Sequence, residues 1–268
     1  MKKGLCLWMA CMLLLTMLFV SCGKGGETEA VPSDGLELIS NGDGTCYVAG
    51  LGSCTDTDVV IPKKSLSGDS VTSIGDSAFR DCTGLTSITI GDSVTSIGKG
   101  AFYRCTGLTS VTIGDGVTSI GRGAFAYCTG LTSITVSEGN TVYHSIDNCV
   151  IETSTQTLIA GCKNSVIPDS VTSIGKYAFP SCTGLTSITI PDSVTSIDDS
   201  AFAYCTGLTS ITIPDSVTSI GDDAFSGCTG LTDVYYAGTE QEWAEIEIDS
   251  GNDELMNATI HYNSVPEE

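Results

Sequence analysis

The chain has 268 residues, of which 41% are hydrophobic, and this is enough to bury a sizeable core. It is strongly acidic, with 32 Asp and Glu against 11 Lys and Arg and a formal net charge of −21 at pH 7. Nucleic-acid and anionic-membrane surfaces need clustered Lys and Arg, so the charge balance argues against both classes of partner.

Residues 1–21 are typical of a secretory signal peptide, because two lysines precede an apolar run that continues to Val20. The ending LFVSC resembles a bacterial lipobox, in which the cysteine receives a diacylglycerol and becomes the new N-terminus; Phe19 stands where Leu is usual. We therefore expect lipidation of Cys22 and attachment to the membrane through this lipid. An uncleaved anchor helix is the alternative, since residues 4–22 are just long enough to span a bilayer.

The residue after Cys22 is Gly23 and not an aspartate. By the same resemblance, this favours an outer membrane lipoprotein of the bacterial cell envelope, facing either the surface or the periplasm. Residues 22–35 are rich in Gly and Glu and have little to bury, so they are expected to form a flexible tether.

Residues 36–68 contain a Gly-rich turn between two alternating segments, which predicts a hairpin that caps the first edge of the fold. Cys46 and Cys54 lie within this segment and are candidates for a disulfide in an exported protein.

A 23-residue pattern then repeats six times, filling 69–137 and 169–237 with three units each. Repetition at a fixed period predicts a solenoid of stacked units. In the first unit, alternating Ile88 and Ile90 predict a strand with one buried face, and SVTSIG predicts a second extended segment. The DSAFRDC stretch between them is long enough only for a single helical or 3₁₀ turn.

Stacking these units predicts one internal column of phenylalanines beside a ladder of cysteines, since no unit could bury its ring alone. The members of this buried ladder are Phe79, Cys82, Phe102, Cys105, Phe125, Cys128, Phe179, Cys182, Phe202, Cys205, Phe225 and Cys228. No Cys-x-x-Cys pair of the kind that binds zinc occurs, so we expect the thiols to be core residues. Ladder disulfides and a metal or catalytic role are the alternatives.

The unit reads C-x-x-L-x-x-I-x-I followed by P/G-D-x-V-x-x-I-G-x-x-A-F, and over nearly all of residues 36–262 it resembles the BspA-like family of bacterial leucine-rich repeat proteins. The resemblance implies a curved leucine-rich repeat solenoid with parallel strands lining one face. It also implies a surface or secreted protein that attaches to host matrix or to other cells.

Residues 138–168 interrupt the period with three alternating segments, which predicts a variant, hairpin-bearing repeat and not a linker. Cys149 and Cys162 are candidates for a second disulfide. Residues 238–268 are expected to cap the other end of the solenoid, because Thr239 and Glu242 form a capping box for a short helix that would lay Trp243 over the last unit.

An aspartate begins each unit, at Asp69, Asp92, Asp115, Asp169, Asp192 and Asp215. We expect these carboxylates to bond backbone amides of their own turns. Weak calcium binding at Asp92, Asp115, Asp192 and Asp215 is the alternative, although the Gly-rich pattern of calcium solenoids is missing.

The strands present Thr and Ser, which predicts a solvated face, with binding of a repetitive ligand such as a glycan as the alternative. A binding surface is expected where the units differ and carry aromatic or basic residues. The candidates are Arg80, Tyr103, Arg104, Tyr127, Tyr177 and Tyr204 on the turn side, and Tyr235, Tyr236 and Trp243 near the C-terminal cap.

No catalytic residue, cofactor site or metal site is expected, because neither a nucleophile elbow nor a phosphate-binding loop occurs. The sequence therefore predicts a binding or attachment module for a protein or glycan on a host or neighbouring cell. A structural envelope repeat protein without a dedicated ligand is the runner-up, and a hydrolase with a pocket beside His144 is third.

Overall fold

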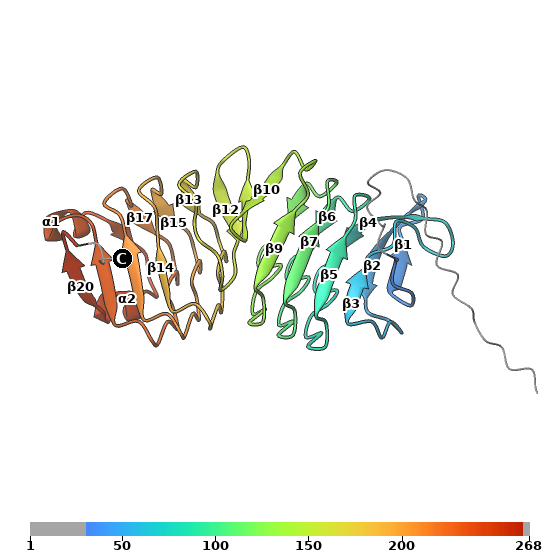
Figure 1. The fold of residues 1–268 in the computed structure, drawn as a ribbon, viewed down its shortest axis with the longest axis horizontal. Coiled ribbons are helices and arrows are strands. Elements are labelled where there is room, and N and C mark those ends of the chain that lie inside the picture. The colour runs from blue at the N-terminus through green and yellow to red at the C-terminus, as the bar shows by residue number, and fades with distance from the viewer. Residues whose placement is uncertain (1–30, 265–268) are drawn as a thin grey trace, which may run out of the picture. The chain divides into compact units, whose positions relative to one another are not determined.

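The computed structural model describes residues 31–264. The predicted signal peptide, the lipidation site Cys22 and most of the predicted tether lie outside the described residues. Residues 31–264 form a β-solenoid in which each regular unit contributes one short strand to each of two parallel ladders (Figure 1). No helix in this range is both long and apolar enough to cross a membrane.

Each ladder is divided at the variant repeat, so the two ladders give four sheets. The first sheet is β1 (Glu37–Ser40), β2 (Thr45–Gly50), β4 (Ser70–Ile74), β6 (Ser96–Ile97) and β8 (Ser119–Ile120). The second is β3 (Asp58–Val60), β5 (Ser87–Ile90), β7 (Ser110–Ile113) and β9 (Ser133–Val136). The third is β10 (Tyr143–Ile146), β11 (Cys149–Glu152), β12 (Thr157–Ala160), β13 (Ser173–Ile174), β15 (Ser196–Ile197), β17 (Ser219–Ile220) and β19 (Glu247–Ile248). The fourth is β14 (Ser187–Thr189), β16 (Ser210–Ile213), β18 (Asp233–Tyr236) and β20 (Thr259–Tyr262).

The 23-residue period fixes the register of these parallel strands. Ile88 of β5 lies opposite Val111 of β7, which lies opposite Ile134 of β9. All three side chains are buried, because residues one unit apart lie opposite each other and point to the same face of the ladder.

The turn that carries Phe and Cys is a chain of tight turns and not a helix. Its bonds are of the 3₁₀ type, for example from Cys105 N to the Phe102 carbonyl at 3.1 Å. Two positions in every unit have left-handed backbone, and these stop the helix before it can continue. They are occupied by Ser77 and Asp81, Gly100 and Arg104, Gly123 and Tyr127, Tyr177 and Ser181, Ser200 and Tyr204, and Asp223 and Gly227.

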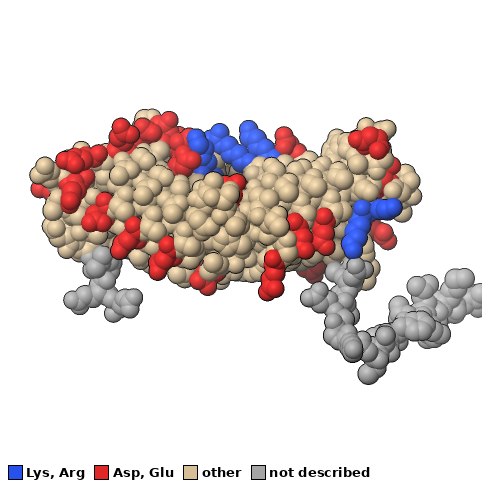
Figure 2. Space-filling model, turned by 90° about the horizontal axis from the view of Figure 1, so that it is seen from above, with Lys and Arg blue, Asp and Glu red and all other residues tan. Residues whose placement is uncertain are grey.

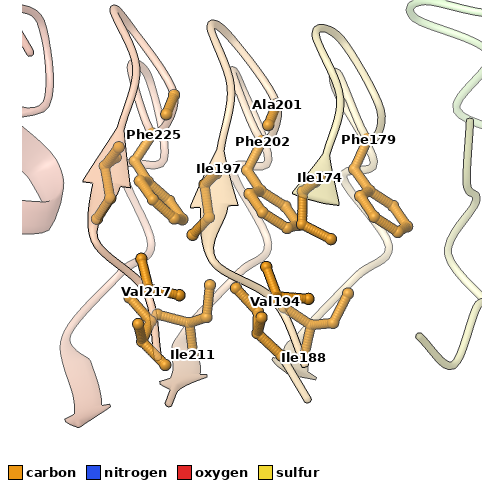
Figure 3. Packing of buried hydrophobic residues seen from close by; sticks show 14 of the residues in the cluster. Ile174, Phe179, Ile188, Val194, Ile197, Ala201, Phe202, Ile211, Val217 and Phe225 are labelled. Carbon is orange, nitrogen blue, oxygen red and sulfur yellow. The ribbon is translucent and has the colours of Figure 1, made fainter. Parts of the chain in front are cut away.

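The phenylalanines form two columns of three, so the prediction of a single column is wrong. Phe179, Phe202 and Phe225 stack nearly parallel, with ring centroids 5.1 and 5.3 Å apart (Figure 3). Phe79, Phe102 and Phe125 stack at 5.2 and 5.4 Å in the other half. The columns are separate because the variant repeat has no Phe turn; it places Gly161 against the Phe179 ring instead.

Each half of the cysteine ladder is held by hydrogen bonds. The thiols of Cys105 and Cys128 donate to the carbonyls of Phe79 and Phe102, at 2.9 and 3.1 Å. The thiols of Cys205 and Cys228 donate in the same way to the carbonyls of Phe179 and Phe202, at 3.0 and 3.1 Å. These four cysteines are buried.

Cys82 and Cys182 open their halves and are only partly buried, because neither has a preceding Phe turn over it. All ten described cysteines are free thiols. The two candidate disulfides, between Cys46 and Cys54 and between Cys149 and Cys162, are therefore not formed in the structure.

The variant repeat separates two cores. Its strands β10, β11 and β12 form an antiparallel meander, and β12 then pairs in parallel with β13. Along β11, Val150 packs into the N-terminal core while Cys149 and Ile151 pack into the C-terminal core. The buried side chain of Asn140 fastens the meander to the preceding unit by donating to the carbonyls of Gly114 and Val117, both at 2.9 Å.

Both ends of the described solenoid are covered. At the first end, β1 and β2 form an antiparallel hairpin. At the last, the capping box of Thr239 and Glu242 starts helix α1 (Glu240–Trp243), and Trp243 packs edge-on against Tyr236 with centroids 5.1 Å apart. A second short helix, α2 (Asp253–Asn257), precedes β20.

Candidate functional site

The turn side carries a cluster of cationic and aromatic side chains near the middle of the solenoid. We call it the basic-aromatic surface, and its members are Arg80, Lys99, Tyr103, Arg104, Arg122, Tyr127, Lys176, Tyr177 and Tyr204. It holds five of the eight Lys and Arg in residues 31–264, and all five are exposed. Figure 2 shows Lys and Arg gathered along one edge at mid-length, with Asp and Glu to either side.

Three of these cations occupy the same position in their units, Lys99 and Arg122 in consecutive units and Lys176 in the first unit after the variant repeat. The eighth residue of each unit is, in chain order, Asp76, Lys99, Arg122, Lys176, Asp199 and Asp222. The backbone confirms that neighbouring members lie side by side, since Ser77 N donates to the Lys99 carbonyl at 3.0 Å and Gly100 N to the Arg122 carbonyl at 3.2 Å. Arg122 contacts Tyr177, the neighbour of Lys176, so Lys99, Arg122 and Lys176 together form a cation row with an aspartate at each end.

Tyrosine rings hold the arginines beside this row. The guanidinium of Arg80 lies 4.7 Å from the Tyr103 centroid, and that of Arg104 lies 5.8 Å from both Tyr103 and Tyr127. Such contacts fix a flexible cation over an aromatic face and leave its outer N–H groups free to donate.

The same surface bridges the two halves of the solenoid. Arg122 lies 4.4 Å from the Tyr177 centroid and donates to its hydroxyl at 2.7 Å. The rings of Tyr127 and Tyr204 meet with centroids 6.0 Å apart, across the interruption in the repeat. Burial raises the pKa of the Tyr127 phenol above its ordinary value.

The cations differ in how they are neutralised. Lys176 bonds Asp199 at 2.7 Å, which raises the lysine pKa and lowers the pKa of the carboxyl. Arg80 contacts Asp81 at 3.4 Å. Within residues 31–264, Lys99, Arg104 and Arg122 form no ion pair with a carboxylate. Three uncompensated cations in so acidic a chain are available to an anionic group from outside.

Two hollows adjoin the surface. An open groove of about 540 Å³ is lined by Arg80, Lys99, Arg122 and the rings of Tyr103, Tyr127 and Tyr177, with Asp76 at one side. A crevice of about 370 Å³ lies behind Arg122 and Tyr177, where the cores of the two halves face each other. Its walls include Phe125, Leu131 and Pro180.

Several of these side chains stand on left-handed backbone. Arg104, Tyr127 and Tyr204 have φ of 62°, 63° and 60° at a position where the last unit has Gly227. A non-glycine residue in this conformation costs about 1–2 kcal/mol. Glycine suits this position without that cost, yet five of the six units carry another residue there, and in three of them it is a long side chain of the basic-aromatic surface.

The turn-side candidates from the sequence thus come together, but those at the C-terminal cap do not. Tyr236 and Trp243 are 1% and 6% exposed, so the prediction that they form a binding surface is wrong: both pack the cap. Tyr235 stacks on His261 with centroids 4.8 Å apart. Sequence reasoning missed Lys99, Arg122 and Lys176. Aligning the units would have revealed them, because all three are the eighth residue of their units.

The aspartates that begin the units differ in their partners, and Asp69 accepts from the Ser67 hydroxyl at 3.4 Å. Asp92 accepts from the Asp115 amide at 3.1 Å and not from its own turn. Within residues 31–264, no three His, Cys, Asp or Glu side chains are arranged to hold a metal ion. The calcium alternative for Asp92, Asp115, Asp192 and Asp215 therefore finds no ligand set in this part of the chain.

The threonine hydroxyls are used within the fold. Thr109 and Thr132 each donate to the carbonyl of the threonine 23 residues earlier, at 2.9 and 3.0 Å, and Thr209 and Thr232 do the same at 3.0 and 3.2 Å. A hydroxyl engaged in this way has no hydrogen left for a ligand. This weakens the Thr rows as a site for a repetitive ligand.

His144 lines neither hollow; its Nδ1 lies 3.0 Å from the Thr153 hydroxyl oxygen. His261 bonds Asp233 at 2.8 Å on the strands of the C-terminal cap. Neither hollow therefore provides the pocket beside His144 that a hydrolase would need.

Comparison with known proteins agrees with the repeat architecture. The model for the BspA type leucine rich repeat region matches residues 54–160 and 151–248, in six copies. A leucine-rich repeat protein of T. pallidum is 25% identical, with 76% of this chain and 80% of that one covered and a TM-score of 0.44. One from Eubacterium ventriosum is 23% identical, covering 76% and 70%, with a TM-score of 0.46. The pneumococcal vaccine antigen PcpA is 18% identical, covering 67% and 62%, with a TM-score of 0.46. No curated protein matches significantly.

Proposed function

Because this chain belongs to the BspA-type leucine-rich repeat family, we propose that it is a lipid-anchored, extracytoplasmic binding module that attaches to a protein or glycan on another surface. Proteins built from such repeats are usually surface-associated and act by binding. The lipobox-like sequence that ends at Cys22 supports the anchor, and the basic-aromatic surface supports the attachment.

One observation carries this proposal: Arg104, Tyr127 and Tyr204 hold a left-handed position that glycine fills in the last unit. Strained positions of this kind persist where the side chain serves a purpose that the backbone does not. Tyr and Arg are also the residues that most often dominate the binding energy of protein interfaces.

Glycine substitutions test the attachment. The double variant Arg104→Gly with Tyr127→Gly relieves backbone strain while it deletes two members of the surface. We expect it to fold and to lose most adhesion of protein-bearing cells to immobilised extracellular matrix or to other bacterial cells. Asp223→Gly is the matched control, because Asp223 is left-handed at φ 56° in the last unit and outside the surface. Adhesion by the double variant equal to that of the control would contradict the proposal.

The anchor is tested separately. Incorporation of an alkyne-labelled fatty acid, followed by detergent phase partitioning, is expected for the full chain and should be lost in Cys22→Ser. Equal labelling of the variant would contradict lipidation at this cysteine. Removal of the protein by protease added to whole cells would place it on the outer surface.

A further inference from the structure

We infer that the groove on the basic-aromatic surface binds a linear acidic polysaccharide, with carboxylate groups lying along the cation row. This inference rests on the proposed function, since it names the ligand class of that same surface. The observation behind it is an alignment of exposed cations: Lys99 and Arg122 lie in consecutive units and line the groove, and Lys176 follows in the first unit after the variant repeat.

Without a bound anion, the positive charges of the cation row repel one another. Neighbouring strands of a sheet lie about 4.8 Å apart, so Lys99 and Arg122, in neighbouring units, are placed at roughly that spacing. Like charges at such a distance repel by on the order of 1 kcal/mol even in water. Lys176 is relieved by Asp199, whereas Lys99 and Arg122 have no carboxylate partner within residues 31–264. A row of anions from outside would remove this repulsion.

The spacing and direction of the row favour a polymer whose charges recur along one axis. A pyranose unit has about the length of one solenoid rung, so successive acidic sugars can follow successive units. The arginines are already held in place by tyrosine rings, so little side-chain entropy is lost when they bind a carboxylate.

The ends of the row limit the charge of the ligand. Asp76 precedes Lys99 and Asp199 follows Lys176, so a polymer that is densely charged over a long stretch would meet repulsion at both ends. Carboxylates in these places accept hydrogen bonds from sugar hydroxyls. The arrangement therefore suits a short acidic segment within a hydroxyl-rich chain, better than nucleic acid or a heavily sulfated polymer.

The floor of the groove argues against a peptide. It is built from turns that contain Ser77, Gly100 and Gly123, and it is not the edge of a sheet. Extended peptides bind by adding a strand to such an edge, and helices bind in apolar grooves. The groove provides neither, whereas cations, phenol hydroxyls and small polar turns suit sugars.

The test is titration of the chain from residue 23 onward with a set of oligomers, at 50 and 300 mM NaCl. The probes are a uronic-acid oligosaccharide, an alternating uronate and amino-sugar oligosaccharide, a heavily sulfated oligosaccharide, poly-glutamate and neutral dextran. We expect the two carboxylated oligosaccharides to bind best and the affinity to fall with salt. Tighter binding of poly-glutamate or of the sulfated oligosaccharide, or no binding of any carboxylated sugar at 50 mM NaCl, would overturn the inference.

Three variants locate the site. Lys99→Gln removes a cation whose side chain has no ion pair within residues 31–264 and should weaken binding about tenfold, the loss expected for one charged hydrogen bond. Lys64→Gln makes the same charge change at an exposed lysine outside the surface and should leave the affinity unchanged. An equal effect of the two variants would refute the assignment of the row.

Asp76→Asn should increase the affinity. The amide keeps an oxygen to accept from the Lys99 amide, a bond of 2.7 Å in the structure, while the repulsive charge is removed. A misfolded protein would not bind more tightly, so this variant separates charge from stability; weaker binding would overturn the inference. Failure with every sugar, together with adhesion that is lost in the Arg104→Gly, Tyr127→Gly double variant and kept in Asp223→Gly, would reject the glycan while leaving the attachment function standing.

Discussion

Replacing Phe102 by alanine should destabilise the N-terminal half of the solenoid strongly. The ring is fully buried and stacks between Phe79 and Phe125, with centroids 5.2 and 5.4 Å away. Loss of a buried Phe costs about 3–5 kcal/mol, depending on how far the cavity can collapse. Two neighbouring rings, each worth about 0.5–1.5 kcal/mol beyond buried area, place Phe102→Ala near the top of that range.

Phe125→Ala is the matched comparison. This ring ends the column, is 8% exposed and has one stacking neighbour, because it faces the crevice between the halves. We expect a loss near the bottom of the range, about 3 kcal/mol, since one stacked pair fewer is broken and the space left can admit water. The predicted difference between the two variants is therefore about 1–2 kcal/mol.

Urea unfolding in reducing buffer measures both losses by far-UV circular dichroism. Trp243 is the single tryptophan after residue 23 and lies in the C-terminal core, so its fluorescence reports the other half of the solenoid. If the two cores unfold separately, Phe102→Ala will shift the dichroism transition and leave the Trp243 midpoint in place. A loss under about 1 kcal/mol for Phe102→Ala, or a larger loss for Phe125→Ala, would refute the stacked-column account.

Thiol reagents should modify Cys82 and Cys182 before the four cysteines whose thiols donate to phenylalanine carbonyls, and mass spectrometry of the folded protein will show the order. Burial raises the pKa of Cys82 to about 11, so its labelling should accelerate from pH 7 to pH 10; early modification of the carbonyl-bonded thiols would contradict this. Burial also raises the pKa of Cys149 to about 12 from an ordinary 9.0, so the stability it contributes is complete below pH 9 and is lost as the pH rises towards 12. The urea midpoint should decrease as the pH is raised from 8 to 11, and it should decrease less in Cys149→Ser. An identical decrease in the variant would show that Cys149 is not the group responsible. Thr239→Ala should cost about 1 kcal/mol through loss of the helix cap, while Thr239→Ser should cost little. Trp243 fluorescence during unfolding will measure this, and equal losses would exclude the cap as the cause.

The regular units could be predicted from the sequence because their contacts repeat at the same spacing as their residues. Ile88, for example, was expected on a buried strand face, and it lies there at 1% exposure. The prediction of a single phenylalanine column was wrong. Whether the column is continuous depends on residues 138–168, and the sequence of this segment occurs only once in the chain. Their alternating pattern predicts short strands, but it does not show that Val150 and Ile151 would face different cores.

The candidate site was predicted only in part. Tyr103, Arg104 and Tyr127 were found as departures from the repeat, and they do lie together. Lys99 and Arg122 were missed, because each looks like an ordinary solvated charge until the units are aligned by position. The left-handed backbone could not be predicted, since residues as different as Tyr127, Ser181 and Gly227 share that conformation.

The hydroxyl and thiol hydrogen bonds between units allow the gene for this protein to gain or lose whole units. The bonds donated by Thr109, Thr132, Thr209 and Thr232 join residues 23 apart, and those donated by Cys105, Cys128, Cys205 and Cys228 join residues 26 apart. Recombination that deletes or duplicates one whole unit within either run therefore joins a donor to an equivalent acceptor and leaves the bonding scheme intact. The meander has no such freedom, because each of its faces fits a different core. Related genes should therefore vary in the number of units on either side of the meander and keep the meander itself, so the length of the protein can evolve while the junction between its two cores stays in place.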